Sequence, residues 1–209
     1  MFIQTLFTDP RFFFARLLLV VVSICTHEYF HALTAYKLGD PTAAERGHLT
    51  LNPAKQMGFL SLIMLCFIGI AWGQIPVNPA NLRGKHAPAL VSASGPAANV
   101  MLTILFSILA VAGAVGQINP FAQGMLLYGA IINMVLALFN LLPIPGLDGW
   151  NILRTYWRKD LSMTAEWVKG AFFILLILVF TCFDYLYMAA EFIVLHFCNL
   201  LLALHGGMQ

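Results

Sequence analysis

The sequence predicts an all-α polytopic membrane protein with about five transmembrane helices, a re-entrant segment and a short β-strand or hairpin element. Of its 209 residues, 60% are hydrophobic and only 10% are charged, whereas a soluble domain carries about 25% charged residues. The mean hydropathy of +0.83 agrees with several membrane spans. The net charge of +2, without a basic run, indicates no nucleic-acid partner.

Five apolar stretches approach or exceed the roughly 20 residues that a membrane-spanning helix needs. They are about 12–36, 89–115, 121–142, 168–186 and 188–204. The apolar stretch 58–72 is shorter, and we expect it to enter the bilayer and turn back. The expected organisation is a membrane core over 1–158, with a strand and re-entrant region over 45–77, followed by a helical membrane hairpin over 159–209.

The basic residues between the spans favour the same topology. If 58–72 turns back, all of them fall on one side of the membrane, which the positive-inside rule assigns to the cytoplasm. If 58–72 crosses, Arg83 and Lys85 fall on the opposite side. The residues concerned are Lys37, Arg46, Lys55, Arg83, Lys85, Arg154, Arg158, Lys159 and Lys169.

A His-Glu-x-x-His motif lies in the second half of the first predicted span. On a helix, His27 and His31 lie one turn apart on one face, so both imidazoles can reach one zinc ion. Glu28 lies beside that face, where it can take a proton from a metal-activated water. The alternative is a set of ordinary core residues. Ionisable groups within a span cost at least about 2.5–3.5 kcal/mol each, which favours the metal site.

A catalytic zinc site normally has three protein ligands and a water molecule. We expect Asp148 to be the third ligand, because it follows a break in the chain made by Pro143 and Pro145. The alternative is that Asp148 caps a helix over 150–158. With 58–72 turning back, Asp148 returns to the side of the membrane on which His31 lies. The other histidines lack an obvious ligand context; they are His48, His86, His196 and His205.

Three ordered motifs resemble the signature regions of the site-2 proteases, which are intramembrane zinc metalloproteases. They are HEYFHA at 27–32, SGPAAN at 94–99 and NLLPIPGLDG at 140–149. The stretches GHLTLNPAKQMG at 47–58 and PVNPANLRG at 76–84 resemble the small prokaryotic branch of that family, which lacks a PDZ domain. From the residues alone, Gly95, Ala97 and Ala98 indicate close helix packing, with Asn99 as a polar contact.

The resemblance implies a zinc metalloendopeptidase in a prokaryotic cell membrane, with transmembrane proteins as substrates. The charge pattern and topology predict that the active site faces the cytoplasm. The resemblance also implies that Zn²⁺ is bound by His27, His31 and Asp148, that Glu28 is the catalytic base, and that Asn140 acts in catalysis or substrate binding. We expect Asn140 to donate to the oxyanion that develops during hydrolysis.

Three further expectations follow from the pattern of residues. The stretch 45–52 alternates in polarity and is interpreted as a strand that could accept an extended substrate, with an ordinary polar loop as the alternative. The apolar faces of the last two spans could support a homodimer. The competing functions are a metal-ion or proton transporter, since intramembrane ionisable residues also mark ion pathways, and a scaffold with a structural metal.

Overall fold

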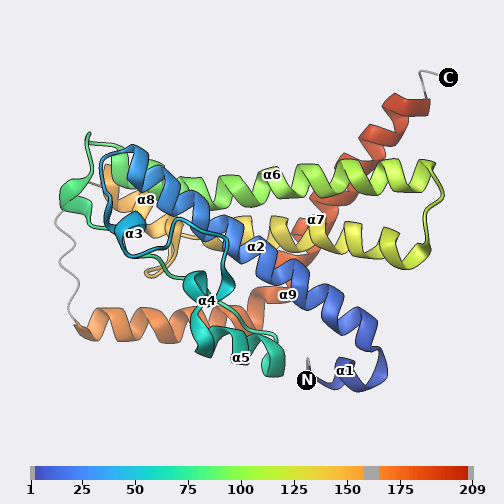
Figure 1. Ribbon diagram of the computed structural model, residues 1–209, viewed down its shortest axis with the longest axis horizontal. Coiled ribbons are helices and arrows are strands. Elements are labelled where there is room, and N and C mark those ends of the chain that lie inside the picture. The colour runs from blue at the N-terminus through green and yellow to red at the C-terminus, as the bar shows by residue number, and fades with distance from the viewer. Residues whose placement is uncertain (1–2, 158–164, 207–209) are drawn as a thin grey trace. The chain divides into compact units, whose positions relative to one another are not determined.

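The computed structural model describes residues 3–157 and 165–206 (Figure 1). Helices make up most of these residues, and no strand occurs among them. The chain divides into two compact units, Met1–Ala87 and Pro88–Gln209. The first unit contains α1 (Gln4–Thr8), α2 (Pro10–Lys37), α3 (Thr42–Glu45), α4 (Pro53–Gln56), α5 (Gly58–Ile68) and the 3-10 turn η1 (Pro79–Asn81).

The long helix α2 has well-defined ends. Asp9 accepts a hydrogen bond from the Phe12 amide at 3.1 Å, and Pro10 occupies the first helical position, where a missing N–H costs nothing. No glycine or proline interrupts the chain until Gly39, which takes a φ of 103° just after the helix. The same Asx-Pro start recurs at α4, η1 and α7.

The apolar helix α5 forms one arm of a hairpin that folds back on itself. Its 11 residues extend about 16 Å, roughly half the thickness of the bilayer core. Ser61 donates to the Trp72 carbonyl at 2.7 Å and accepts from the Trp72 amide at 2.9 Å. The Gln74 amide donates to the Gln56 carbonyl at 3.0 Å, so the chain returns to the point where the hairpin began. The chain over 58–72 therefore folds back as predicted, and its entry into the bilayer stays a prediction.

The strand predicted over 45–52 is wrong. A strand would offer its carbonyl groups to a neighbouring strand, but here the Gln56 side-chain amide donates to the carbonyls of His48 and Thr50. The His48 amide in turn donates to the Ala43 carbonyl at 2.8 Å, which closes the end of α3. Local turns and one buried glutamine thus satisfy this backbone, and the alternation in polarity reflects no sheet.

The second unit contains α6 (Ala87–Val115), α7 (Pro120–Asn140), α8 (Asp148–Tyr156) and α9 (Ala165–Gly206), with α6 beginning at the boundary residue. α6 and α7 lie side by side (Figure 1) and are joined by side-chain hydrogen bonds. Asn99 donates to Asn133 at 2.9 Å, and Thr103 donates to the Ala130 carbonyl at 3.2 Å. Asn99 and Asn133 are fully buried, which confirms the predicted polar contact of Asn99 within a packed interface.

Small residues let α7 and α9 pack closely. Ala130 on α7 and Ala190 on α9 are fully buried, together with Ile131, Val135 and Val194. Alanines at such positions allow two backbones to approach, which is how helices associate within a bilayer. This cluster is the core of the second unit.

Within the described residues, four helices are long and apolar enough to cross a membrane. They are α2, α6, α7 and the part of α9 over Phe183–Gly206. The spans predicted over 12–36, 89–115 and 121–142 are confirmed by α2, α6 and α7. The chain is thus a multi-pass membrane protein by the length and composition of its helices.

The C-terminal hairpin predicted over 159–209 is wrong in its described part. The expected spans 168–186 and 188–204 belong to one continuous helix, α9, which runs for 42 residues. Most side chains of the first of these spans lie outside the described residues. No glycine or proline lies between Gly170 and Gly206, so nothing in the sequence ends the helix where a hairpin turn would be needed.

The Asn99–Asn133 hydrogen bond leads to a testable prediction for the α6–α7 interface. Asn99→Ala removes the donor and leaves the Asn133 carbonyl oxygen without it, so we expect a loss of about 0.6–1.7 kcal/mol in the free energy of unfolding. Unfolding titrations in mixed micelles measure this change. Asn199→Ala, at an exposed position on α9, is the matched control and should leave stability unchanged. Equal stability of the Asn99 variant and the control would show that the Asn99–Asn133 hydrogen bond does not stabilise the α6–α7 interface.

Candidate metal centre

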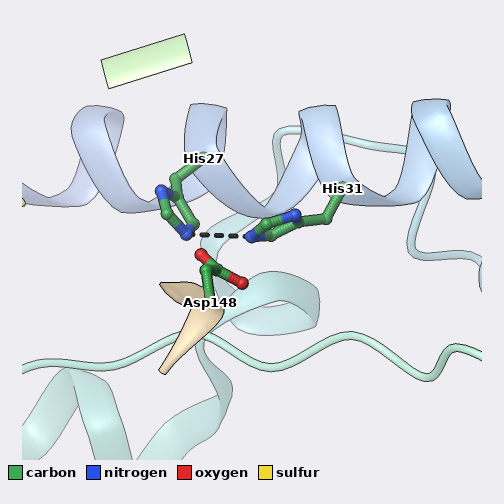
Figure 2. Close-up of side chains that lie close together, drawn as sticks. All are labelled: His27, His31 and Asp148. Atoms are coloured by element: carbon green, nitrogen blue, oxygen red, sulfur yellow. Dashed lines mark hydrogen bonds between the residues drawn. The ribbon is translucent and has the colours of Figure 1, made fainter. Parts of the chain in front are cut away.

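Two histidines on α2 converge on one point. His27 and His31 are 6% exposed, and their Nε2 atoms lie 3.0 Å apart. The ring centroids are 4.6 Å apart and the ring planes meet at 85° (Figure 2). One helical turn separates the two residues, so their spacing follows directly from the uninterrupted helix around them. The predicted convergence of the two imidazoles is therefore confirmed.

This donor pair fits a metal ion. Two nitrogens that bind one tetrahedral zinc ion at 2.0–2.1 Å lie roughly 3.3 Å from each other, close to the observed separation. His27 and His31 supply two nitrogen donors, and the sequence predicts Asp148 as the third ligand. Two neutral imidazoles and one carboxylate are a donor set typical of catalytic zinc.

Asp148 follows a tight turn within its own unit. The chain leaves α7 after Asn140, and backbone hydrogen bonds from Ile144 to Leu142 and from Leu147 to Ile144 close the turn. Asp148 is then the first residue of α8, and the cap position belongs to Leu147. The alternative of an Asp148 cap on a helix over 150–158 is wrong, because that helix begins at Asp148 itself.

Glu28 is also buried, at 8% exposure, and the returning arm of the α5 hairpin passes directly beside it. A side-chain carbon at Gly73 would overlap the Glu28 carboxyl group. In extended backbone, neighbouring side chains point to opposite faces. Trp72 and Gln74 are both exposed, so the position between them faces inward. Glycine at 73 therefore lets the backbone lie against the carboxyl group.

The remaining predicted site residues lie elsewhere. Asn140 is the last residue of α7, and its side-chain amide donates to the Leu136 carbonyl at 2.9 Å. His48, His86, His196 and His205 belong to no metal-binding group among the described residues. Burial and the nearby Lys55 and Arg46 lower the pKa of His48, which keeps this imidazole neutral in its polar connection.

Sequence reasoning missed Gly73. The signal available was a glycine between a tryptophan and a glutamine, after an apolar stretch too short to cross the bilayer. That pattern indicates a close backbone approach, but it does not identify the neighbour. Only the pairing of Trp72 with Ser61 and of Gln74 with Gln56 directs residue 73 towards α2.

Comparison with known proteins identifies one protein family and several relatives that are similar to this chain. The family described as Peptidase family M50 matches residues 113–181. YwhC of Bacillus subtilis is 39% identical over 142 residues, which cover 64% of this chain and 65% of YwhC. Rip2 of Mycolicibacterium smegmatis is 33% identical over 172 residues, covering 77% of this chain and 64% of Rip2. Rip2 of Mycobacterium tuberculosis is 30% identical over 166 residues, with the same coverage.

These relatives carry names that describe them as candidate zinc metalloproteases. The chain spans slightly less than two thirds of their length. No solved structure matches it. The region matched to the family contains Asn140 and Asp148, while the helix with His27 and His31 precedes it.

The close approach of residue 73 to Glu28 yields a prediction for Gly73→Ala. Overpacking costs about 1–3 kcal/mol, and an equal loss in the transition state lowers the rate about fivefold to 150-fold. We expect the rate of peptide cleavage to fall at least about fivefold, while the zinc content is retained. Cleavage rate and bound zinc are measured on the same purified sample.

Gly124→Ala on α7 is the matched control, because a side-chain carbon there meets no atom within 4 Å. It should leave cleavage and zinc content unchanged. If Gly73→Ala behaved like this control, residue 73 would not constrain the Glu28 carboxyl group.

Proposed function

We propose that the chain, which matches peptidase family M50 over residues 113–181, is an intramembrane zinc metalloprotease that hydrolyses peptide bonds in or near transmembrane segments of membrane proteins. The observation that carries the proposal is the pair of buried imidazoles on α2, with Nε2 atoms 3.0 Å apart and Glu28 beside them. Burying three ionisable groups in an apolar helix is costly unless each has a partner and a role.

In this proposal, His27, His31 and Asp148 hold the zinc ion. Zinc at such a site acts as a Lewis acid, which lowers the pKa of water towards 7 and polarises the substrate carbonyl. With only these two imidazoles and one carboxylate as protein ligands, the site would have the donor set typical of catalytic zinc. A scaffold with a structural metal would need a fourth protein ligand to close the site.

Glu28 is the general base of the reaction. Its carboxylate accepts a proton from the attacking water and then returns that proton to the leaving amine. The neighbouring segment around Gly73 removes solvent from one side of the carboxyl group, which keeps the proton between water, Glu28 and substrate. An isolated water-facing glutamate would exchange that proton with bulk solvent instead.

Asn140 is proposed to stabilise the oxyanion. A carboxamide carries two N–H donors, and one of them is used within α7 for the Leu136 carbonyl. That bond fixes the direction of the amide plane, so the second N–H has a defined orientation. Such preorganised donors are the usual means of stabilising charge that develops during acyl transfer.

We further propose that the protein resides in a prokaryotic cell membrane with its active site towards the cytoplasm. The basic residues at and after the end of the spanning helix support this orientation, since Lys37 is the last residue of α2 and Arg46, Lys55 and Arg83 lie beyond it. The exposed apolar face of α9, which includes Tyr185, Met188 and Phe192, supports contact with lipid or with a second copy in a homodimer.

The central test is Glu28→Gln. Glutamine keeps the size of the side chain but cannot accept the proton, so cleavage of a membrane-protein substrate should fall by about 100-fold or more. Zinc content should not change, because Glu28 is no ligand in this proposal. Zinc analysis and cleavage in reconstituted vesicles provide the two measurements.

Glu45→Gln, at an exposed position outside the site, is the control and should leave both readouts unchanged. Full cleavage by the Glu28 variant would refute the mechanism. Zinc flux across the vesicles without any cleavage would favour the transporter instead.

The third ligand has its own test. Asp148→Ala removes one donor, so we expect zinc affinity to fall by at least about tenfold, since even partners of ligands contribute 10–100-fold. Asp184→Ala, at an exposed position on α9, controls for the loss of an acidic residue. Competition with a chelator of known affinity measures both. Unchanged affinity in the Asp148 variant would show that another residue completes the site.

A further inference from the structure

A buried aspartate lies just beyond the helix that carries the histidines. Asp40 has no solvent-exposed surface, and its carboxylate accepts hydrogen bonds from two separate segments of the chain. Within its own turn, the Thr42 amide donates at 3.1 Å, and the Thr42 hydroxyl donates as well. From the segment after the hairpin, the Asn78 amide donates at 2.7 Å and the Asn81 side chain at 3.0 Å.

These bonds favour the charged form of Asp40. Burial alone opposes ionisation, but the donors from Thr42, Asn81 and Asn78 outweigh it and hold the pKa of Asp40 below its ordinary value. The carboxylate is therefore charged at neutral pH, and hydrogen bonds to charged groups contribute more than neutral ones. A neutral amide at this position would lose both the charge and one acceptor oxygen.

A second connection reinforces the same junction. The Arg83 amide donates to the Leu38 carbonyl at 2.8 Å. Gly39 takes a φ of 103°, and a side-chain carbon there would press against the Arg83 side chain. The end of α2 and the segment Asn78–Arg83 are thus joined at several points within the first unit.

Only a short segment of chain separates the two contacts of this region with α2 and its following turn. Gly73 lies against Glu28, and Asn78 lies against Asp40. Helix rise separates Glu28 from Leu38 by about 15 Å, whereas the chain from Gly73 to Asn78 reaches at most about 17 Å when extended. A segment of six residues thus joins the two contacts, and we expect a shift at one end to displace the other.

We propose that Asp40 is a positioning residue that anchors the segment 73–78 along α2 and thereby holds Gly73 against the Glu28 carboxyl group. Its effect on catalysis rests on the proposed function of Glu28. Its effect on the segment does not, because the anchor is defined by the hydrogen bonds to Asn78 and Asn81.

The test uses Asp40→Asn in the full-length protein. Amide hydrogen exchange over 73–83 should become faster, while exchange over α5 and the zinc content should stay unchanged. The turnover number should fall about tenfold, since a small misplacement near reacting groups has effects of this order, with little change in KM. Asp9→Asn is the matched control, because Asp9 caps the opposite end of α2 at an exposed position; neither exchange over 73–83 nor turnover should change.

A double-mutant cycle adds a readout that a purely structural role would not move. If Asp40 acts through Gly73, the effects of Asp40→Asn and Gly73→Ala on kcat should be less than additive. Additive effects, or unchanged exchange over 73–83, would overturn the proposal. So would faster exchange with unchanged turnover.

Should Asp40→Asn fail to insert or fold, Asn81→Ala removes a single donor and should give smaller changes in the same direction. Absence of any zinc-dependent cleavage by the unmodified protein would refute the proposed function. The exchange measurement would still show whether Asp40 anchors the segment.

Discussion

The burial of ionisable groups within an apolar helix is the constraint on which the first unit depends. His27, Glu28 and His31 lie on α2 where lipid or apolar side chains would otherwise surround them, and each needs a polar partner. The two imidazoles direct their Nε2 atoms to one point, while the hairpin brings backbone against the glutamate. A segment that crossed the bilayer could not bring residue 73 back to α2. The short α5 is therefore what allows Gly73 to lie against Glu28.

The same rule governs the non-helical chain of this unit. Irregular backbone at membrane depth persists only where protein or trapped water satisfies its polar groups. Ser61 bonds both the amide and the carbonyl of Trp72, and Gln56 accepts from the Gln74 amide. The second unit satisfies its polar groups differently, by pairing Asn99 with Asn133 between two regular helices. Buried polar side chains thus fix the hairpin in one unit and helix packing in the other.

The part of the fold that follows from local chemistry could be predicted. The spacing of His27 and His31 needs only an uninterrupted helix, and the fold-back of 58–72 needs only its length and the charges around it. Asn or Asp followed by Pro marks the starts of several helices, a signal that sequence reasoning could have used. The continuity of α9 was equally accessible, because no helix-breaking residue separates its two apolar stretches.

What could not be predicted depends on contacts between distant parts of the chain. The polarity pattern at 45–52 suits a strand, yet one side chain, Gln56, takes its carbonyl acceptors. Asp40 looks like an ordinary turn residue after Gly39, and its donors at 78 and 81 are invisible from its local sequence.

The role of the glycine at 73 also depends on how its neighbours are held. An extended segment can present backbone to Glu28 only if its flanking residues are bonded away from α2, as Trp72 and Gln74 are. Any larger residue at 73 would then collide with the carboxyl group, because the hairpin and the turn at Asp40 fix both ends. Hence the environment of the proposed catalytic base is set from outside the His-Glu-x-x-His motif. A search limited to the motif finds the ligands but not the segment that confines the base.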